Sequence, residues 1–378
     1  MKPDYNRSIL SVSSSILKYY NLDANYKSLA ELDAVLKNKY KNIVFLILDC
    51  LGVNIINNNL SENNLLKKNI LTTVTTVFPS TTVAATTAFH SGLSPYETGW
   101  VGWMLYFKEY DRMIEVFSGK DFYTEEKIID PPGETFLKYE QIYEKICKKN
   151  QKVNLHKIFP SFAENGSKTF EELCSKIKLA CENEGQNLIS AYWDEPDHTI
   201  HYNGVKSNAT YEVLKNIDDN LKKLAEELSD TLIIISADHG AVDVNEVYLN
   251  EIKELDELLS KPLSIESRFA SFFIKEGMQE KFLTEFKKHF KDKYKLYSKE
   301  EFLKEQLLGL GKKHERIDSY LGDLIFISES NLAIRYALPN TKKKFHVADH
   351  AGLTKDEMLV PVIVVECKTK SQKFKTKS

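Results

Sequence analysis

The sequence lacks the features that mark a membrane-spanning or disulfide-stabilised protein. No apolar stretch reaches the roughly 20 residues that a membrane-spanning helix needs. The first twenty residues carry Asp4, Arg7 and a serine cluster instead of the apolar segment of a secretory signal. The five cysteines are odd in number, irregularly spaced and form no CxxC pair, which favours reduced thiols. We therefore expect a cytoplasmic protein with no membrane partner.

Strong net charge is also lacking, because 51 basic and 54 acidic residues are interspersed and leave a formal charge of -3. Without a basic field we expect no nucleic acid polymer as a partner. The one strongly basic run is the tail 368–378, which is short and polar. The hydrophobic fraction of 42% supplies a substantial core for a chain of 378 residues.

Four short apolar runs, rich in β-branched residues, are typical of buried strands. They span residues 42–48, 188–193, 231–236 and 360–365. Helical periodicity lies between them, at 82–89 and at 211–228. Strands that alternate with helices predict a doubly wound α/β fold with a mostly parallel sheet.

Two stretches interrupt this pattern and look inserted. Residues 106–150 are charged, aromatic and weakly periodic, whereas 268–318 open with a strand-like run followed by helical stretches at 278–290 and 299–308. We predict a catalytic core formed by 1–265 and 319–378, with 266–318 as a small inserted α+β cap.

Aspartates and histidines gather at the predicted strand ends, where ligands collect in open parallel sheets. Asp197 and His201 are four residues apart, so one helical face could present both to a single ion. Asp238 and His239 end another strand, and the following glycine permits a sharp turn. Asp49 ends the first strand and His350 precedes the last.

Each of these residues alone has a simpler explanation, since aspartate often follows strands as a turn residue and a DxxxH pair occurs on many solvated helices. Their coincidence at several strand ends favours a metal site.

The segment 72–87 places several hydroxyls just before a predicted helix. Pro79 is followed by Ser80, Thr81 and Thr82, and small residues then lead into the helix. A hydroxyl at a helix N-terminus lies in a positive field that favours an alkoxide and a bound phosphoryl oxygen. Helix capping is the alternative role for any of the three, because serine and threonine are preferred caps; the nearby metal ligands favour a nucleophile.

In their order, these motifs resemble the alkaline phosphatase superfamily, and within it the nucleotide pyrophosphatase/phosphodiesterase branch. The matching motifs are LILD at Asp49, Pro79-Ser80-Thr81-Thr82 with Ser91-Gly92, Pro95 to Gly99, Glu195-Pro196-Asp197 with His201, Asp238-His239-Gly240, and His350 with Gly352.

The resemblance implies an alkaline-phosphatase-like α/β sandwich that binds two divalent ions, zinc by preference with manganese as the alternative. It implies that Thr82 is the nucleophile and also a metal ligand. One ion would be held by Asp197, His201 and His350. The other would be held by Asp49, Asp238 and His239. One departure is Trp103, which stands where well-known members carry an asparagine that binds a phosphoryl oxygen.

The expected activity is hydrolysis of a small-molecule phosphate ester, such as a nucleotide, through a phosphothreonine intermediate. The preferred substrate class is a phosphodiester or a pyrophosphate. No arginine lies close to Thr82, Asp197 or His350 in sequence, although Arg268 could fold into the site, and phosphomonoesterases of the superfamily surround phosphate with more positive charge. Phe78, Trp100, Trp103 and Tyr106 could form an aromatic wall, with core packing as the alternative.

A phosphomonoesterase and a phosphonate hydrolase of the same superfamily remain alternatives, as does an inactive relative that binds nucleotides. A sulfatase is disfavoured because its C/S-x-P-x-R motif is replaced by STTVA. The sequence predicts no oligomeric state.

Overall fold

The computed structural model describes residues 1–291, 293–339, 341 and 343–367; the basic tail 368–378 lies outside them. Its largest feature is a six-stranded sheet, in the order β2-β17-β8-β1-β7-β6. The strands are β2 Ile70–Thr75, β17 Leu359–Cys367, β8 Thr231–Ser236, β1 Asn42–Leu48, β7 Gln186–Trp193 and β6 Val153–Ile158.

This sheet is mostly parallel, as the apolar runs predict. β1 pairs in parallel with β7 on one side and β8 on the other, and β6 extends the parallel part beyond β7. β17 alone runs the other way, antiparallel to both β8 and β2. All seven residues of β1 are buried, which explains why its sequence is apolar without alternation.

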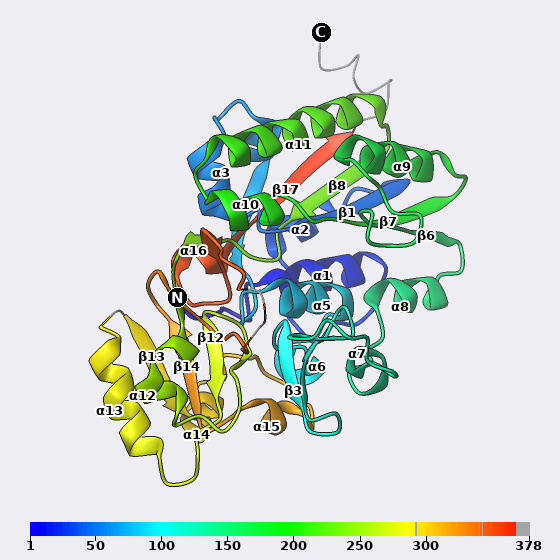
Figure 1. Cartoon of the computed structure of the whole chain (residues 1–378). Coiled ribbons are helices and arrows are strands. Elements are labelled where there is room, and N and C mark those ends of the chain that lie inside the picture. The colour runs from blue at the N-terminus through cyan, green and yellow to red at the C-terminus, as the bar shows by residue number, and fades with distance from the viewer. Residues whose placement is uncertain (292, 340, 342, 368–378) are drawn as a thin grey trace.

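Helices cover both faces of the sheet (Figure 1). One face carries α3 Val53–Asn59, α4 Leu65–Lys68, α9 Phe170–Glu182, α10 Asp197–Asn203 and α11 Asn208–Glu227. The other carries α1 Ile9–Tyr19, α2 Ala30–Val35, α5 Thr82–Ser91 and α8 Ile142–Lys149. The helices expected at 82–89 and 211–228 are thus confirmed as α5 and α11.

A second, seven-stranded sheet builds the other end of the molecule, in the order β13-β14-β12-β11-β3-β4-β5. Its strands are β13 Tyr294–Ser298, β14 Leu324–Ser328, β12 Phe269–Phe272, β11 Ser264–Ile265, β3 Met104–Phe107, β4 Arg112–Glu115 and β5 Lys120–Asp121. The helical elements around it are α6 Pro95–Thr98, α7 Pro132–Thr135, η1 Leu249–Glu251, α12 Lys253–Asp256, α13 Gln279–His289, α14 Lys299–Lys304 and α15 Ile317–Tyr320.

The segment 266–318 supplies β12, β13, α13, α14 and the first two residues of α15 to this end of the molecule. The same sheet also includes β3 to β5, β11 and β14, which come from outside that segment. Treating 266–318 as a separate subdomain stays a prediction. The helix expected at 299–308 is too long, because α14 ends at Lys304 and Gln306 has a φ of 53°, outside the helical region.

Two small sheets and one short helix complete the fold beside the carboxyl edge of the large sheet. β9 Val242–Asp243 pairs antiparallel with β16 Ala348–Asp349, and β10 Asn245–Tyr248 pairs parallel with β15 Leu332–Arg335. α16 Lys355–Met358 then leads directly into β17. These pairings bring the chain near residue 350 back to the end of β8.

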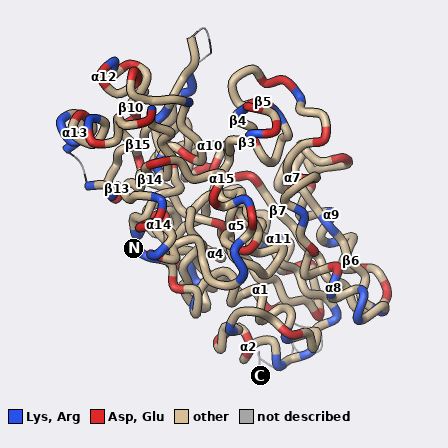
Figure 2. Tube along the Cα trace, turned by 90° about the horizontal axis from the view of Figure 1, so that it is seen from below, with Lys and Arg blue, Asp and Glu red and all other residues tan. Residues whose placement is uncertain are grey.

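The surface and the cysteines agree with the composition. Lys and Arg alternate with Asp and Glu along the trace (Figure 2). None of the five cysteines, all of which lie within the described ranges, forms a disulfide, and four of them are buried. None of the helices among the described residues combines the length and the apolarity that a membrane crossing requires.

A fully buried ion pair joins the second sheet to α16. Arg268 Nε donates to Glu357 Oε1 at 2.6 Å, and Arg268 Nη2 donates to Oε2 at 2.9 Å. Two backbone carbonyls, of Ser330 and Leu332, accept the remaining guanidinium bonds. The expectation that Arg268 could enter the site is therefore wrong, because its guanidinium group is paired with Glu357.

Replacing Arg268 by Met should lower the free energy of unfolding by about 3–5 kcal/mol, because Glu357 would stay buried without its cation. Chemical denaturation, followed by circular dichroism, measures this loss.

Arg112→Met is the matched control, since the ion pair of Arg112 with Glu126 is exposed and should contribute nothing measurable. Adding Glu357→Gln to Arg268→Met should recover part of the loss. An Arg268→Met protein as stable as the parent would contradict the importance of this pair.

Candidate metal and nucleophile site

The carboxyl ends of three adjacent strands carry most of the predicted site. Asp49 directly follows β1, and Asp238 and His239 follow its neighbour β8. On the other side of β1, β7 leads into α10, whose first residue is Asp197 and whose fifth is His201. Because these strands run parallel, their ends meet at one edge of the sheet.

His350 reaches the same edge from a distant part of the chain. It follows β16, and β16 pairs with β9 just beyond His239. This two-stranded pairing stacks the rings of His350 and His239 with their centroids 3.9 Å apart.

Six of the seven predicted residues form two groups of three around these strand ends. In the first, His239 Nε2 lies 3.4 Å from Asp49 Oδ1 and 3.6 Å from Asp238 Oδ2. In the second, Asp197 Oδ2 lies 3.1 Å from His201 Nε2, and Asp197 Oδ1 lies 3.7 Å from His350 Nε2. In each group the ligand atoms lie within 4.8 Å of one another, as a metal ion requires.

Thr82 is the first residue of α5 and faces the first group. Its Oγ1 lies 3.2 Å from His239 Nε2 and 3.4 Å from Asp49 Oδ2. The helix-capping alternative is not what the structure shows, because no side chain caps the start of α5. Ser80 Oγ donates to the Gly352 carbonyl instead, and Thr81 Oγ1 donates to Glu266.

The histidines are oriented for metal binding through Nε2. Each has its other ring nitrogen, Nδ1, beside a backbone carbonyl oxygen. The pairs are His201 with Ala348 at 2.9 Å, His239 with Gly240 at 3.1 Å, and His350 with Ser80 at 3.2 Å. A proton on Nδ1 satisfies the carbonyl and leaves the Nε2 lone pair for a ligand bond.

The carboxylates supply a second test of fit. One oxygen of each aspartate is buried and has no hydrogen-bond partner among the described residues: Asp49 Oδ1, Asp197 Oδ1 and Asp238 Oδ2. A buried carboxylate oxygen without a partner is costly. All three lie near a histidine Nε2, so a divalent ion in each group would satisfy them, and the residues fit two ions.

Burial and mutual repulsion shift the pKa values of these groups. Burial raises the pKa of Asp49 well above its usual range, and repulsion from Asp238 and Asp197 adds to the rise. Burial also raises the pKa of Asp238. Burial opposes the charging of His201, but attraction to Asp197 prevails and raises its pKa to about 9. Without cations the site therefore holds more negative charge than the fold tolerates easily.

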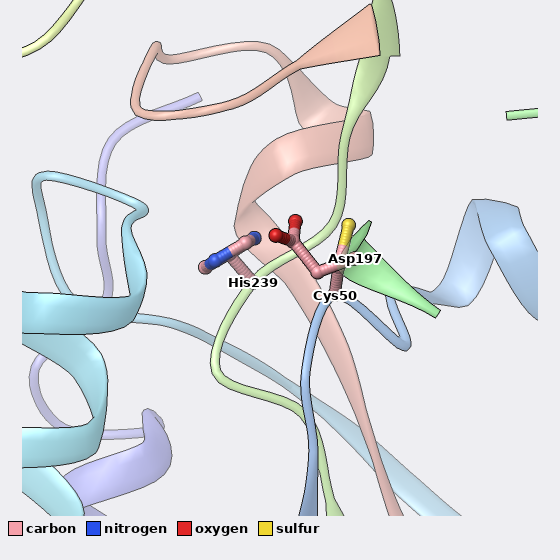
Figure 3. Close-up of side chains that lie close together, drawn as sticks. All are labelled: Cys50, Asp197 and His239. Atoms are coloured by element: carbon pink, nitrogen blue, oxygen red, sulfur yellow. The ribbon is translucent and has the colours of Figure 1, made fainter. Parts of the chain in front are cut away.

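Cys50 is a potential donor that the sequence did not single out as a ligand. Its Sγ, an Asp197 oxygen and a His239 nitrogen lie within 4.8 Å of one another. Figure 3 shows the Asp197 carboxylate between the His239 ring and the Cys50 sulfur. Asp197 thus lies at the boundary between the two groups, and the neighbouring Cys50 is fully buried.

Other contributors were also missed, because they come from positions with no motif. The Tyr192 hydroxyl donates to Asp49 Oδ2. Asp349 Oδ1 lies 3.9 Å from His201 Nδ1, and its other oxygen accepts from Arg335 Nη2 at 2.6 Å. Although burial opposes ionisation, Arg335 holds the pKa of Asp349 well below its usual range. Only the place of Asp349 beside His350 could have suggested such a role.

The aromatic wall expected from sequence is mostly core. Phe78 is fully buried against Phe269, and Trp100 is buried with its Nε1 donating to the Leu137 carbonyl. Tyr106 is partly exposed, and its hydroxyl donates to Asp111. Trp103 is the exception, since its ring is exposed beside Phe117, with the ring centroids 6.2 Å apart.

Comparison with known proteins agrees with this architecture. The sequence model of the type I phosphodiesterase / nucleotide pyrophosphatase family matches residues 43–352. Human ectonucleotide pyrophosphatase / phosphodiesterase 5 has a similar structure, with a TM-score of 0.63 and 16% identity over 86% of this chain and 87% of that chain.

Two further solved structures have the same fold. An inactive variant of the murine phosphodiesterase 5, in complex with AMP, gives a TM-score of 0.60 at 16% identity, covering 86% of this chain and 87% of that one. Phosphonoacetate hydrolase from Sinorhizobium meliloti 1021, in complex with phosphonoacetate, gives 0.61 at 14% identity, covering 85% and 89%. At these identities the likeness establishes an alkaline-phosphatase-like fold.

Because the metal-free site is overcharged, Asp238→Asn should stabilise the chelated protein, on the order of 1 kcal/mol. The Asn oxygen can keep the two bonds of 2.9 Å that Asp238 Oδ1 accepts from the backbone N–H groups of Cys50 and His239. Added zinc should then stabilise the variant much less than the parent. Thermal unfolding with chelator and with zinc measures both effects.

Asp218→Asn is the matched control. Asp218 is also buried, but its two oxygens accept three hydrogen bonds near the start of α4, so an amide must oppose at least one donor. That variant should be less stable with and without zinc. A chelated Asp238→Asn protein that is also less stable than the parent would refute the account of repulsion.

Proposed function

The chain belongs to the type I phosphodiesterase / nucleotide pyrophosphatase family, and from that premise we propose that it hydrolyses a small-molecule phosphodiester or pyrophosphate with Thr82 as the nucleophile. The observation that carries the proposal is the position of Thr82 Oγ1. It lies beside His239 Nε2 and Asp49 Oδ2, two potential ligands of the first group, at the N-terminus of α5.

Two divalent ions fit the donor set. Asp49, Asp238 and His239 would hold one ion near Thr82. Asp197, His201 and His350 would hold the other. When bound, such ions lower the pKa of a hydroxyl and offset the negative charge of the transferred phosphoryl group. Zinc is the preferred ion because the ligands are histidine nitrogens and carboxylates, and manganese is the alternative.

The residues of the chain then divide the remaining work. Asp49 and His239 orient Thr82 Oγ1, and Tyr192 fixes Asp49 by its hydrogen bond to Oδ2. Thr82 Oγ1 attacks phosphorus in line, the bond to the leaving alcohol breaks, and the phosphoryl group remains on Thr82. Water then attacks phosphorus, which releases the monoester and restores the hydroxyl.

The lack of a nearby cationic side chain favours a diester over a monoester as the substrate. Within the described ranges, none of the Lys and Arg residues forms an ion pair with the six proposed ligands, and Arg335 forms its ion pairs with Asp349 and Glu246. A doubly charged monoester would have to rely on the ions alone. A singly charged diester or internal phosphate group needs less compensation.

The substrate we propose is a nucleotide or another ester with an aromatic leaving group. The structure of the murine relative was solved in complex with AMP. In this chain the rings of Trp103 and Phe117 are exposed, and the Trp103 N–H donates to Glu266, which also contacts Thr81. An aromatic ring of the substrate could stack there. The odd number and irregular spacing of the cysteines favour reduced thiols and action in a reducing compartment such as the cytoplasm.

Thr82→Ala should lower kcat to background while leaving the zinc content near that of the parent, since the aspartates and histidines are untouched. Ester turnover and metal analysis of the purified variant measure the two effects. In the parent, acid quenching during turnover should trap a phosphoryl group on the peptide that contains Thr82, detectable by mass spectrometry.

Thr87→Ala is the control, because Thr87 is a buried hydroxyl on the same helix, away from the proposed ligands. It should keep near-parental turnover. Normal turnover by Thr82→Ala would exclude this residue as the nucleophile.

The zinc-loaded protein should hydrolyse bis-p-nitrophenyl phosphate with a higher kcat/KM than p-nitrophenyl phosphate, and a chelator should abolish both activities. A preference for the monoester would assign the chain to phosphatase activity. Turnover of a phosphonate alone would favour the reaction of the phosphonoacetate hydrolase, whose fold is equally similar. Bound zinc with turnover of none of these compounds would indicate a binding protein.

A further inference from the structure

One turn of three residues, 266–268, connects the second sheet to the segments before Thr82 and His350 and to α16. Glu266 accepts a hydrogen bond from Thr81 Oγ1 at 2.7 Å. Ser267 Oγ donates to Asp349 Oδ2 at 2.6 Å, and Arg268 forms the buried pair with Glu357. The Arg268–Glu357 ion pair and the hydrogen bond of Ser267 anchor the turn to the rest of the fold. These two contacts do not explain why a charged residue stands at position 266.

The backbone before Glu266 is strained. Ile265, the last residue of β11, has a φ of 86°, which a β-branched residue rarely adopts. It is fully buried, and a Cβ at Gly102 would approach Ile265 Cγ2 to 2.5 Å, so the glycine just before β3 leaves room for the Ile265 side chain. Strain of this kind persists where the surroundings fix it, commonly at functional sites. Here it directs Glu266 towards the nucleophile segment.

Glu266 carries a charge without a cationic partner. Its Oε1 accepts both the Thr81 hydroxyl and the Trp103 N–H, each at 2.7 Å. Among the described residues nothing donates to its Oε2, and no Lys, Arg or His forms an ion pair with it. Burial raises the pKa of Glu266 to about 7, against the effect of its two hydrogen bonds. The carboxylate is therefore largely ionised in mildly alkaline solution.

The Glu266 carboxylate contacts the segment that presents the reacting hydroxyl. Thr81, whose hydroxyl donates to Glu266, directly precedes Thr82. The next residue of the turn, Ser267, donates to Asp349, which directly precedes His350. Glu266 and Ser267 therefore contact the two segments that present Thr82 and His350.

We propose that Glu266 is a specificity-determining residue that disfavours doubly charged phosphate monoesters relative to singly charged diesters. The proposal rests on the proposed function, because it concerns the phosphoryl group that Thr82 attacks. A monoester carries one more negative charge than a diester above its second ionisation near pH ~6. Although Arg335 attracts the Glu266 carboxylate, its ion pairs are with Glu246 and Asp349, and none of the described residues forms an ion pair with Glu266. The Glu266 carboxylate therefore opposes that additional charge, and we expect this repulsion to change a rate or binding constant about tenfold.

The test is Glu266→Gln, which removes the charge and keeps an oxygen that can accept from Thr81 and Trp103. We compare kcat/KM for p-nitrophenyl phosphate and bis-p-nitrophenyl phosphate at about pH 8.5, where the monoester is doubly charged. The ratio of monoester to diester kcat/KM should rise about tenfold or more. An unchanged ratio, with both values altered in parallel, would overturn the proposal and leave Glu266 a purely structural residue.

A binding measurement separates this proposal from the proposed function. Calorimetric titration of inorganic phosphate into zinc-loaded protein should give a Kd about tenfold lower for Glu266→Gln than for the parent. We expect this difference in Kd even if the parent hydrolyses neither ester, an outcome that would refute only the proposed function. If the parent hydrolyses the diester but the parent and Glu266→Gln bind phosphate with the same Kd, only the role of Glu266 is refuted.

Glu280→Gln controls for the change in net charge. Glu280 lies in the first turn of α13, on the outer side of the second sheet, and should alter neither the ratio nor the Kd. If it shifts both as much as Glu266→Gln does, the effect comes from net charge and the proposal fails.

Discussion

The cost of burying like charges at one edge of a sheet is the constraint on which the rest of the structure depends. Asp49, Asp197 and Asp238 each present a buried oxygen without a hydrogen bond, within reach of a histidine nitrogen. A fold can keep such a cluster only if cations compensate it and if the backbone around it cannot relax. The second condition is visible in how the chain surrounds these aspartates.

The rigid surroundings come from pairings that are remote from the ligands in sequence. β9 and β16 hold the chain around His350 against the end of β8, and Arg335 fixes Asp349 behind His201. Farther out, Glu357 accepts the Gly352 N–H while its carbonyl accepts the Gly240 N–H, so one residue braces both histidine loops. Arg268 then anchors Glu357 to the second sheet. The apolar core thus supports the site through a few buried polar contacts.

The sequence predicted the large sheet, the main helices and the convergence of the seven site residues, because each depends on a local pattern. Apolar β-branched runs mark buried strands wherever they pair, and parallel strands must present their ends at one edge. The sequence did not predict the second sheet, because β3 and β11 are short and pair across about 160 residues without a periodic signal. It also missed Glu266, whose role depends on a strained backbone at Ile265 that no residue pattern encodes, and it misplaced Arg268, since a charged residue near an apolar run gives no sign of its partner.

The central place of β1 has a consequence for how the molecule is made. Its two neighbours in the sheet are β7 and β8, and β7 begins roughly 140 residues later in the chain. During translation this strand, which is apolar after Asn42, leaves the ribosome on the order of ten seconds before either partner exists. Until then its backbone edges are unpaired and attract other strands. Strand β1, which leads into Asp49, is therefore the part of the nascent chain that most needs protection by a chaperone.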